Sequence, residues 1–242
     1  MVTATRFRSW AATHPGAKRT YNEDAYVDRP DIGLWAVADG AGGHAAGEVA
    51  SGMIAKALEA IPVGLRAAEL LAEVRLAIER THAALRAEAA RRGPDVMVAS
   101  TVVVMLARGQ YFACLWAGDS RAYLLRGGAL RQITRDHSLV QELLEAGTIG
   151  PDEVANHPRG NVITRAVGAE LDEFALDKVS DRLAPGDRFL LCSDGLCKTL
   201  SGGVLAGLLG SPDGAAPQAL IDAALALNVS DNVTAVAVEV TR

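Results

Sequence analysis

Short runs of apolar and β-branched residues recur along this chain, and they constrain its fold more than any other feature. Each run has the length of a β-strand and is too short to cross a bilayer. Glycine-containing turns separate the runs between residues 110 and 130, which predicts an antiparallel meander there and disfavours parallel βαβ winding. The strands predicted in this way are residues 25–28, 33–38, 100–107, 111–117, 121–126, 187–192 and 233–240.

Helical patterns lie between these runs. Residues 46–60 and 65–91 carry apolar side chains at three- and four-residue spacing among good helix formers, and residues 217–227 form a third such stretch. Hydrophobic residues make up 50% of the chain and charged residues 22%, which suits a globular protein with a large core. Because no linker-like segment interrupts the sequence, we predict one domain over residues 1–242.

One long segment differs from this alternation. Residues 137–165 are polar and punctuated by Gly and Pro, and they contain a short amphipathic stretch at 139–146. Segments of this kind are often functional lids, so we identify a candidate flap at 137–165, with an ordinary surface excursion as the alternative.

The charge balance and the cysteines exclude several classes of protein. The net charge of -5 argues against a nucleic-acid binder, which would carry a basic face. The first ten residues hold no apolar stretch of signal-peptide length, so we expect a cytoplasmic protein without a membrane segment. Cys114, Cys192 and Cys197 are too few for a disulfide framework and are expected to be buried thiols.

Aspartates stand at the ends of the most apolar runs. Asp39, Asp119 and Asp194 each follow such a run, and Asp231 lies two residues before the last one. Carboxylates that converge at the edge of a buried strand lose hydration and repel one another unless protons or cations compensate them. Hard divalent cations prefer oxygen ligands, so the pattern indicates a Mg²⁺ or Mn²⁺ site rather than a zinc site.

The alternative is that Asp-Gly and Asp-Asn are simply favourable turn sequences. Arg19 is a further candidate, because a guanidinium beside a carboxylate site can pair two phosphoryl oxygens. The glycines at 40–43 could cradle a phosphate, but no Gly-Lys-Ser/Thr follows them, and close approach of the backbone to a metal explains them better.

Taken together, these motifs closely resemble the protein phosphatase 2C (PP2C, PPM) family, and the resemblance spans nearly the whole chain. Further blocks at 46–51, 136–138 and 161–165 look like the bacterial branch of the family. The carrying motifs are Arg19-x-x-Asn22-Glu23-Asp24, Asp39-Gly40-Ala41-Gly42-Gly43-His44, Gly118-Asp119-Ser120-Arg121, Ser193-Asp194-Gly195-Leu196 and Asp231-Asn232-Val233-Thr234.

The resemblance implies an α+β fold, a four-layer αββα sandwich in which two antiparallel sheets pack face to face between flanking helices. It also implies two Mn²⁺ or Mg²⁺ ions and, more weakly, a third. Arg19, Asp39 and Asp194 are the implied catalytic residues, with Arg19 binding the substrate phosphate. The implied metal ligands are Asp39 as the bridge, the Gly40 carbonyl, Asp194 and Asp231, with Glu23 and Asp24 acting through bound waters and Asp119 joining Asp194 at the third ion.

The sequence departs from the family at one position. Many eukaryotic relatives carry a His directly after the Asp-Gly, proposed as the acid that protonates the leaving group, and this chain has Ala41. His44 is a possible substitute, although a role in capping the next helix and a metal-bound water as the acid are the stronger alternatives. His137, at the start of the flap, is expected to be structural.

The implied activity is hydrolysis of phosphoserine and phosphothreonine in proteins, opposing a bacterial Ser/Thr kinase, by a monomer. The short chain also resembles the stand-alone phosphatases of type VI secretion clusters. Two rival functions remain open at this stage, a catalytically silent phosphoprotein-binding module and a hydrolase of small phosphate esters.

Overall fold

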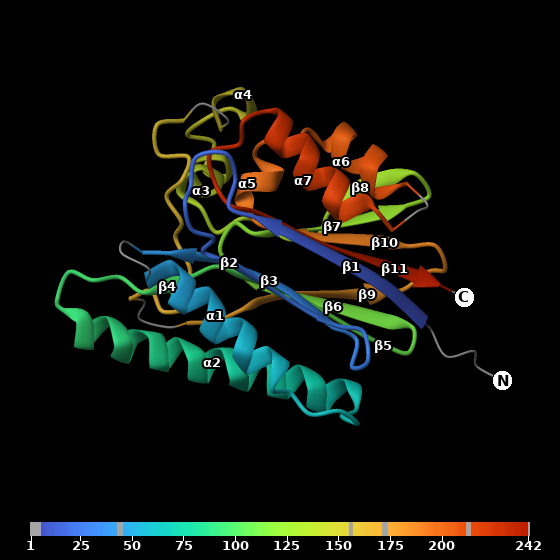
Figure 1. Ribbon diagram of the computed structural model, residues 1–242, viewed down its shortest axis with the longest axis horizontal. Coiled ribbons are helices and arrows are strands. Elements are labelled where there is room, and N and C mark those ends of the chain that lie inside the picture. The colour runs from blue at the N-terminus through green and yellow to red at the C-terminus, as the bar shows by residue number, and fades with distance from the viewer. Residues whose placement is uncertain (1–5, 43–45, 155–156, 171–173, 212–213, 242) are drawn as a thin grey trace.

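The computed structural model describes residues 6–42, 46–154, 157–170, 174–211 and 214–241, which form two packed β-sheets (Figure 1). Neighbouring strands are antiparallel throughout both sheets. The first sheet has the order β1 (Arg6–His14), β11 (Val233–Thr241), β10 (Arg188–Cys192), β7 (Arg121–Arg126), β8 (Ala129–Gln132). The second has the order β2 (Asp24–Arg29), β3 (Leu34–Ala41), β5 (Val102–Arg108), β6 (Tyr111–Ala117), β9 (Asp177–Arg182), with β4 (Ala99–Ser100) beside β3.

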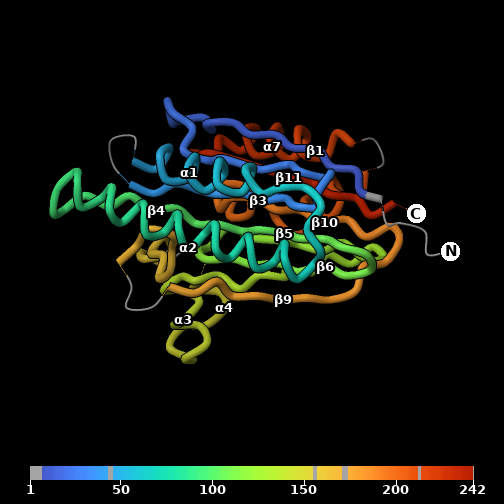
Figure 2. The backbone as a smooth tube through the Cα atoms, turned by 90° about the horizontal axis from the view of Figure 1, so that it is seen from below, coloured from blue at the N-terminus to red at the C-terminus, as the bar shows by residue number. Residues whose placement is uncertain are grey.

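Helices cover the outer face of each sheet, which completes the four layers. Figure 2 shows α1 (Ala46–Glu59) and α2 (Ala67–Arg92) lying over the β2-containing sheet. The short α5 (Asp194–Cys197), α6 (Gly202–Leu209) and α7 (Ala216–Ala226) cover the other sheet (Figure 1). This arrangement confirms the αββα sandwich that the resemblance implied. No helix in the described part of the chain is both long and apolar enough to cross a membrane.

The inner strands are almost continuously apolar because both of their faces are buried. In β3, Leu34, Ala36 and Ala38 pack under α1 and α2, whereas Trp35 and Val37 face the other sheet. Alternate side chains therefore enter different hydrophobic layers, as the two-residue period of a strand requires. Between the sheets, the rings of Phe112 and Phe189 meet edge to face with centroids 4.9 Å apart.

The predicted meander over residues 110–130 is wrong in its central part. β6 pairs with β5 and β9, whereas β7 pairs with β8 and β10, so β6 and β7 belong to different sheets. The turn at Gly118-Asp119-Ser120 carries the chain from one sheet to the other. Gly118 has φ +111° and lies so close to Thr101 that an added Cβ would be 2.5 Å from the Thr101 Cβ. This crossing places Asp119 at the seam between the sheets.

The flap segment, residues 137–165, is a closed excursion from the seam. It contains α3 (Leu139–Glu145) and α4 (Pro151–Val154), and residues 155–156 lie outside the described part. Its two ends are joined by an antiparallel bridge between Ser138 and Ile163 and by a hydrogen bond from Thr164 N to the His137 carbonyl at 2.9 Å. The segment therefore has a fixed base.

Candidate metal centre

Carboxylates from both sheets meet at one end of the sandwich. Asp24 and Asp39 are direct partners in the β2–β3 ladder, and Asp39 lies within β3 rather than after its end. From the other sheet, Asp194 follows β10 and begins α5, while Asp231 lies two residues before β11. Asp119 enters from the crossing between the sheets. The strand-end pattern in the sequence therefore identifies residues that the fold brings together.

The mutual repulsion of these groups is visible in their pKa values. Burial raises the pKa of Asp39 well above its ordinary value, and the negative charges of Asp24, Asp194, Asp119 and Asp231 raise it further. Burial likewise raises the pKa of Asp24 to about 7, although hydrogen bonds from two hydroxyl groups partly oppose this shift. A set of carboxylates that cannot all ionise comfortably attracts cations.

Asp24 joins the two sheets. Its Oδ2 atom accepts hydrogen bonds from Ser193 Oγ and Thr234 Oγ1, both at 2.7 Å, and these donors belong to the opposite sheet. The Ser193 Oγ also accepts a hydrogen bond from Thr234 N at 3.0 Å. Asp24 was expected to act through metal-bound waters; the structure additionally gives it a role in holding the sheets in register at the site.

The backbone of Asp39 is fixed by Thr101, a residue outside the sequence motifs, whose hydroxyl also contacts Ser120 of the Gly118-Asp119-Ser120-Arg121 motif. Asp39 N donates to Thr101 Oγ1 at 3.2 Å, and Thr101 N donates to the Asp39 carbonyl at 2.8 Å. Thr101 Oγ1 also shares a hydrogen bond of 2.7 Å with Ser120 Oγ. Thr101 therefore couples Asp39 to the loop that carries Asp119. Thr101 begins an apolar run and carries no distinguishing signal in the sequence.

Glycines permit helix α1 to dock against this end of β3. A Cβ at Gly40 would lie 2.1 Å from the Gly47 carbonyl oxygen, and a Cβ at Gly47 would lie 2.6 Å from Glu23 Oε1. Gly40 N also donates to the Glu23 carbonyl at 3.1 Å. For Gly40, predicted to allow the backbone to approach a metal, the structure shows a close approach to helix α1, with Glu23 beside Gly47 at the edge of the site.

Arg19 lies beside Asp231 on the open side of the centre. Arg19 Nη2 is 3.1 Å from Asp231 Oδ1, and about half of each side chain is exposed, 53% and 45%. Asn232 holds the loop in place: its Oδ1 accepts from Glu23 N at 2.8 Å, and its Nδ2 donates to the Pro15 and Tyr21 carbonyls, both at 2.9 Å. An exposed guanidinium at this position is available to an incoming anion.

Lys198 occupies the region where Asp119 and Asp194 were expected to hold a third ion. Its Nζ lies 2.8 Å from Asp119 Oδ2 and 2.7 Å from Asp194 Oδ2. It also contacts Asn161 Oδ1 of the flap segment at 3.3 Å. The sequence analysis missed Lys198, although its spacing of four residues from Asp194 is a detectable signal for a pair on one helical face.

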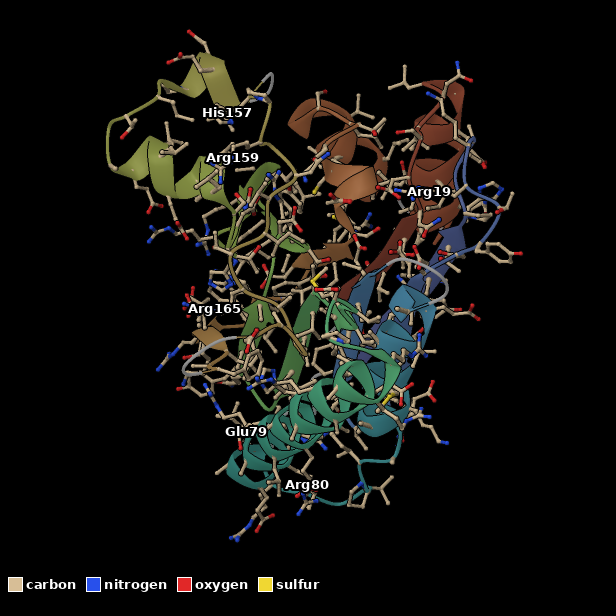
Figure 3. The ribbon with its side chains drawn as sticks, turned by 90° about the vertical axis from the view of Figure 1, so that its left-hand side faces the viewer. Arg19, Glu79, Arg80, His157, Arg159 and Arg165 are labelled. Atoms are coloured by element: carbon tan, nitrogen blue, oxygen red, sulfur yellow. The ribbon has the colours of Figure 1, made fainter. Side chains whose placement is uncertain are left out.

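A pocket of about 490 Å³ separates the flap segment from α5, and Asp119, Asn161 and Lys198 are among its lining residues. In Figure 3, which views this end of the molecule, Arg19 lies on one side of the strand ends, and His157 and Arg159 of the flap segment lie on the other. The site is thus open to a ligand from between these two sides.

The base of the flap segment is anchored by polar contacts. The Arg121 guanidinium donates to both carboxylate oxygens of Asp136, with the shortest contact at 2.7 Å. His137 Nδ1 accepts from Gly118 N at 3.1 Å, and burial lowers the pKa of His137. This position agrees with the structural role expected for His137.

The residues present fit divalent cations. The candidate ligands are oxygen donors, and two buried carboxylate oxygens, Asp24 Oδ1 and Asp119 Oδ1, have no hydrogen-bond partner among the described residues. In the same part of the chain, no three His, Cys, Asp or Glu side chains are close enough to form a complete ligand set. Ions that take few carboxylates and retain several waters, as Mg²⁺ does, suit such an open arrangement.

The structure describes the predicted thiols but not the alternative proton donor. Cys114, Cys192 and Cys197 are buried free thiols, as predicted. His44, considered as a proton donor in place of the missing histidine at Ala41, lies outside the described residues.

Comparison with known proteins identifies the family. The family model for protein phosphatase 2C matches residues 16–204. The serine/threonine protein phosphatase PstP of Mycobacterium tuberculosis is 38% identical over 232 residues, covering 95% of this chain and 44% of PstP. The chain therefore spans less than half the length of that relative.

Two solved structures extend the similarity over nearly the whole chain. PppA, a key regulatory component of the T6SS in Pseudomonas aeruginosa, is 42% identical with a TM-score of 0.89, covering 98% of this chain and 99% of PppA. The catalytic domain of PstP in complex with 2 manganese ions is 35% identical with a TM-score of 0.88, covering 99% and 100% of the two chains. On the family match, the shared fold and this similarity, the chain belongs to the protein phosphatase 2C family.

Proposed function

We propose that this protein is a metal-dependent protein serine/threonine phosphatase. The observation that carries the proposal is the convergence of Asp39, Asp194 and Asp231 from two sheets, with the Arg19 guanidinium beside Asp231. Asp39, the Gly40 carbonyl, Asp194 and Asp231 would hold two Mn²⁺ or Mg²⁺ ions, and Glu23 would contribute at the edge. When bound, such ions would acidify a water for attack on phosphorus and neutralise phosphate charge.

The protein's own groups then divide the remaining work. Arg19 binds the phosphoryl oxygens, because a guanidinium pairs with two oxygens at once. Asp24 and Thr101 hold the carboxylates of the two sheets in position through the hydrogen bonds described above. The pocket under the flap segment gives room for the residues around the phosphorylated side chain. The contacts and positions of these residues support these roles.

The test is Mn²⁺-dependent release of phosphate from a phosphothreonine peptide. We expect the wild type to be active, Asp194→Asn to lose at least about 100-fold in rate, and EDTA to abolish activity. Asp222→Asn is the matched control, because Asp222 is an exposed carboxylate on α7 whose partner is Gln218. It should retain wild-type rates.

The same assay separates the rival functions. A folded protein that binds Mn²⁺ and phosphopeptide but releases no phosphate would support the silent binding module. Faster turnover of small phosphate esters than of phosphopeptides would support the small-ester hydrolase. Either result contradicts the proposed function.

We further propose that this phosphatase acts as a monomer in the cytoplasm, opposing a Ser/Thr kinase, in a type VI secretion setting. Similarity to PppA over nearly all of both chains supports the type VI secretion setting. The direct test is incubation with an autophosphorylated bacterial Ser/Thr kinase, followed by intact-mass measurement of the kinase. Sedimentation of the phosphatase tests the monomer. Persistence of all kinase phosphates alongside rapid turnover of a phosphopeptide would contradict the kinase assignment alone.

A further inference from the structure

The ammonium group of Lys198 lies at the junction of three parts of the molecule. It contacts Asp119 on the crossing between the sheets, Asp194 at the start of α5 and Asn161 in the flap segment, at 2.8, 2.7 and 3.3 Å. A protonated lysine has three N–H donors and no acceptor, so these three oxygens satisfy it completely. The surrounding side chains therefore form a complete binding site for the ammonium group of Lys198.

The burial of Asp119 makes its ion pair with Lys198 more important. Asp119 is 1% exposed, whereas the Lys198 side chain is 32% exposed. An ionised carboxylate this deeply buried needs a compensating charge, and Lys198 is the cation within ion-pair distance of Asp119 in the described structure. The charges of Asp194 and Asp119 also raise the pKa of Lys198, which more than offsets the opposing effect of burial.

Lys198 competes with a divalent ion for the carboxylates of Asp119 and Asp194, because its ammonium already takes one oxygen of each, and among their buried oxygens only Asp119 Oδ1 is left without a hydrogen-bond partner in the described residues. Mg²⁺ binds carboxylate oxygens at about 2.0–2.1 Å and so requires the side-chain oxygens that face each other across the gap. One oxygen of each residue already accepts a hydrogen bond from Nζ. An ion placed there would also lie next to the positive charge of Lys198.

We propose that Lys198 is the resident counter-cation of Asp119 and Asp194, so that this protein binds two divalent ions and has no third site. The number of two bound ions rests on the proposed function. The replacement of the third ion by Lys198 does not depend on that function. Through Asn161 the same ammonium also ties the flap segment to the metal centre, which makes Lys198 a positioning residue.

The experiment counts bound Mn²⁺ by isothermal titration calorimetry and by anomalous diffraction from crystals grown in Mn²⁺. We expect two ions in the wild type and three in Lys198→Asp, where a carboxylate replaces the ammonium beside Asp119 and Asp194. The affinity of the additional ion should exceed that of any third ion in the wild type by at least about tenfold, because ligand charge sets affinity in such sites. Lys198→Met removes the charge without adding a ligand. Its affinity for a third ion should lie between the affinities of the wild type and of Lys198→Asp.

Two control variants isolate the cause. Lys178→Asp changes the net charge by the same amount at an exposed position of β9 and should bind two ions. Asn161→Ala removes the flap contact but leaves the ammonium in place, and it should also bind two. Circular dichroism verifies that each variant is folded.

The outcomes distinguish this inference from the proposed function. Three ions in the folded wild type would overturn it, since the ammonium would then move aside for the third ion, and two ions in both wild type and Lys198→Asp would overturn it as well, since Lys198 would not be what excludes a third ion. A wild type that binds two ions but hydrolyses no phosphopeptide would overturn the proposed function and leave the Lys198 inference standing.

Discussion

The carboxyl group of Asp24 experiences opposing influences on its pKa. Hydroxyl groups of Ser193 and Thr234 stabilise its charged form, whereas burial and the charges of Asp194 and Asp231 stabilise its neutral form. Burial dominates, and the pKa rises from 3.8 to about 7. The folded protein therefore retains a proton in a range of pH where the unfolded chain has released it.

This shift predicts that the metal-free protein becomes less stable as pH rises. The contribution of Asp24 is complete below about pH 4 and is lost between about 4 and 7, amounting to roughly 2–4 kcal/mol. Urea unfolding in EDTA at pH 5 and pH 8 should show this loss in the wild type. In Asp24→Asn the loss should be smaller, because the amide does not titrate. An unchanged pH dependence would contradict the assignment.

Arg19 is predicted to act on phosphate rather than on stability. Arg19→Ala should lower kcat/KM for a phosphothreonine peptide by about 10- to 100-fold, which corresponds to one or two charge-assisted hydrogen bonds. Arg8→Ala is the matched control, because Arg8 is 57% exposed and forms an ion pair with Glu239 at 2.7 Å. Equal losses in the two variants would exclude a specific role for Arg19 at the site.

Among the elements, helix α1 offers a comparison of two glycines in one helix. Gly47 is in contact with Gly40 and Glu23, whereas a Cβ at Gly52 would meet nothing within 4 Å. The two positions therefore separate helix propensity from docking against β3.

Gly47→Ala is expected to destabilise the protein by about 1–3 kcal/mol and to weaken Mn²⁺ binding, because the added methyl displaces Glu23 and the Gly40 carbonyl. Gly52→Ala should instead be neutral or stabilise by up to about 1 kcal/mol. Thermal unfolding and Mn²⁺ titration of both variants test this contrast. Similar behaviour of the two would mean that the glycines have no role in docking.

The sequence predicted elements with strong patterns, including the edge strand β2, and missed three other edge strands. The limits of α1 and β6 follow closely from hydrophobic spacing, since each has a fully defined apolar face. β1, β8 and β9 are edge strands with half-exposed, charged sequences such as Asp177-Lys178-Val179-Ser180-Asp181-Arg182, so their patterns resemble loops. Pairing with a neighbour, rather than local sequence, makes them strands.

In the molecule as a whole, the aromatic layer between the sheets is predicted to supply much of the stability. Phe189 is fully buried there, and Phe189→Ala should cost about 3–5 kcal/mol. Tyr111→Ala, at an aromatic residue 54% exposed on β6, should cost less than about 1 kcal/mol. Urea denaturation measures both, and comparable costs would contradict the proposed position of the core.

The charged residues of the candidate site were predictable from the sequence, but the contacts of the side chains that hold them in position were not. Asp39, Asp119, Asp194 and Asp231 follow from their positions beside apolar runs. The hydroxyl groups that orient them and the ammonium of Lys198 depend on which strands become neighbours across the two sheets, which periodicity does not reveal.

The meeting of the two sheets at this centre has a consequence for the choice of ion. Asp39 belongs to one sheet and Asp194 to the end of a strand in the other, so the hydrophobic layer acts as a spacer that sets the gap between opposing carboxylates. A thicker layer favours an ion with long bonds, such as Ca²⁺ at about 2.3–2.6 Å, and a thinner one favours Mg²⁺ at about 2.0–2.1 Å. On this argument, the volume of core side chains such as Phe112 and Phe189 would influence which metal fits, without any change among the ligands.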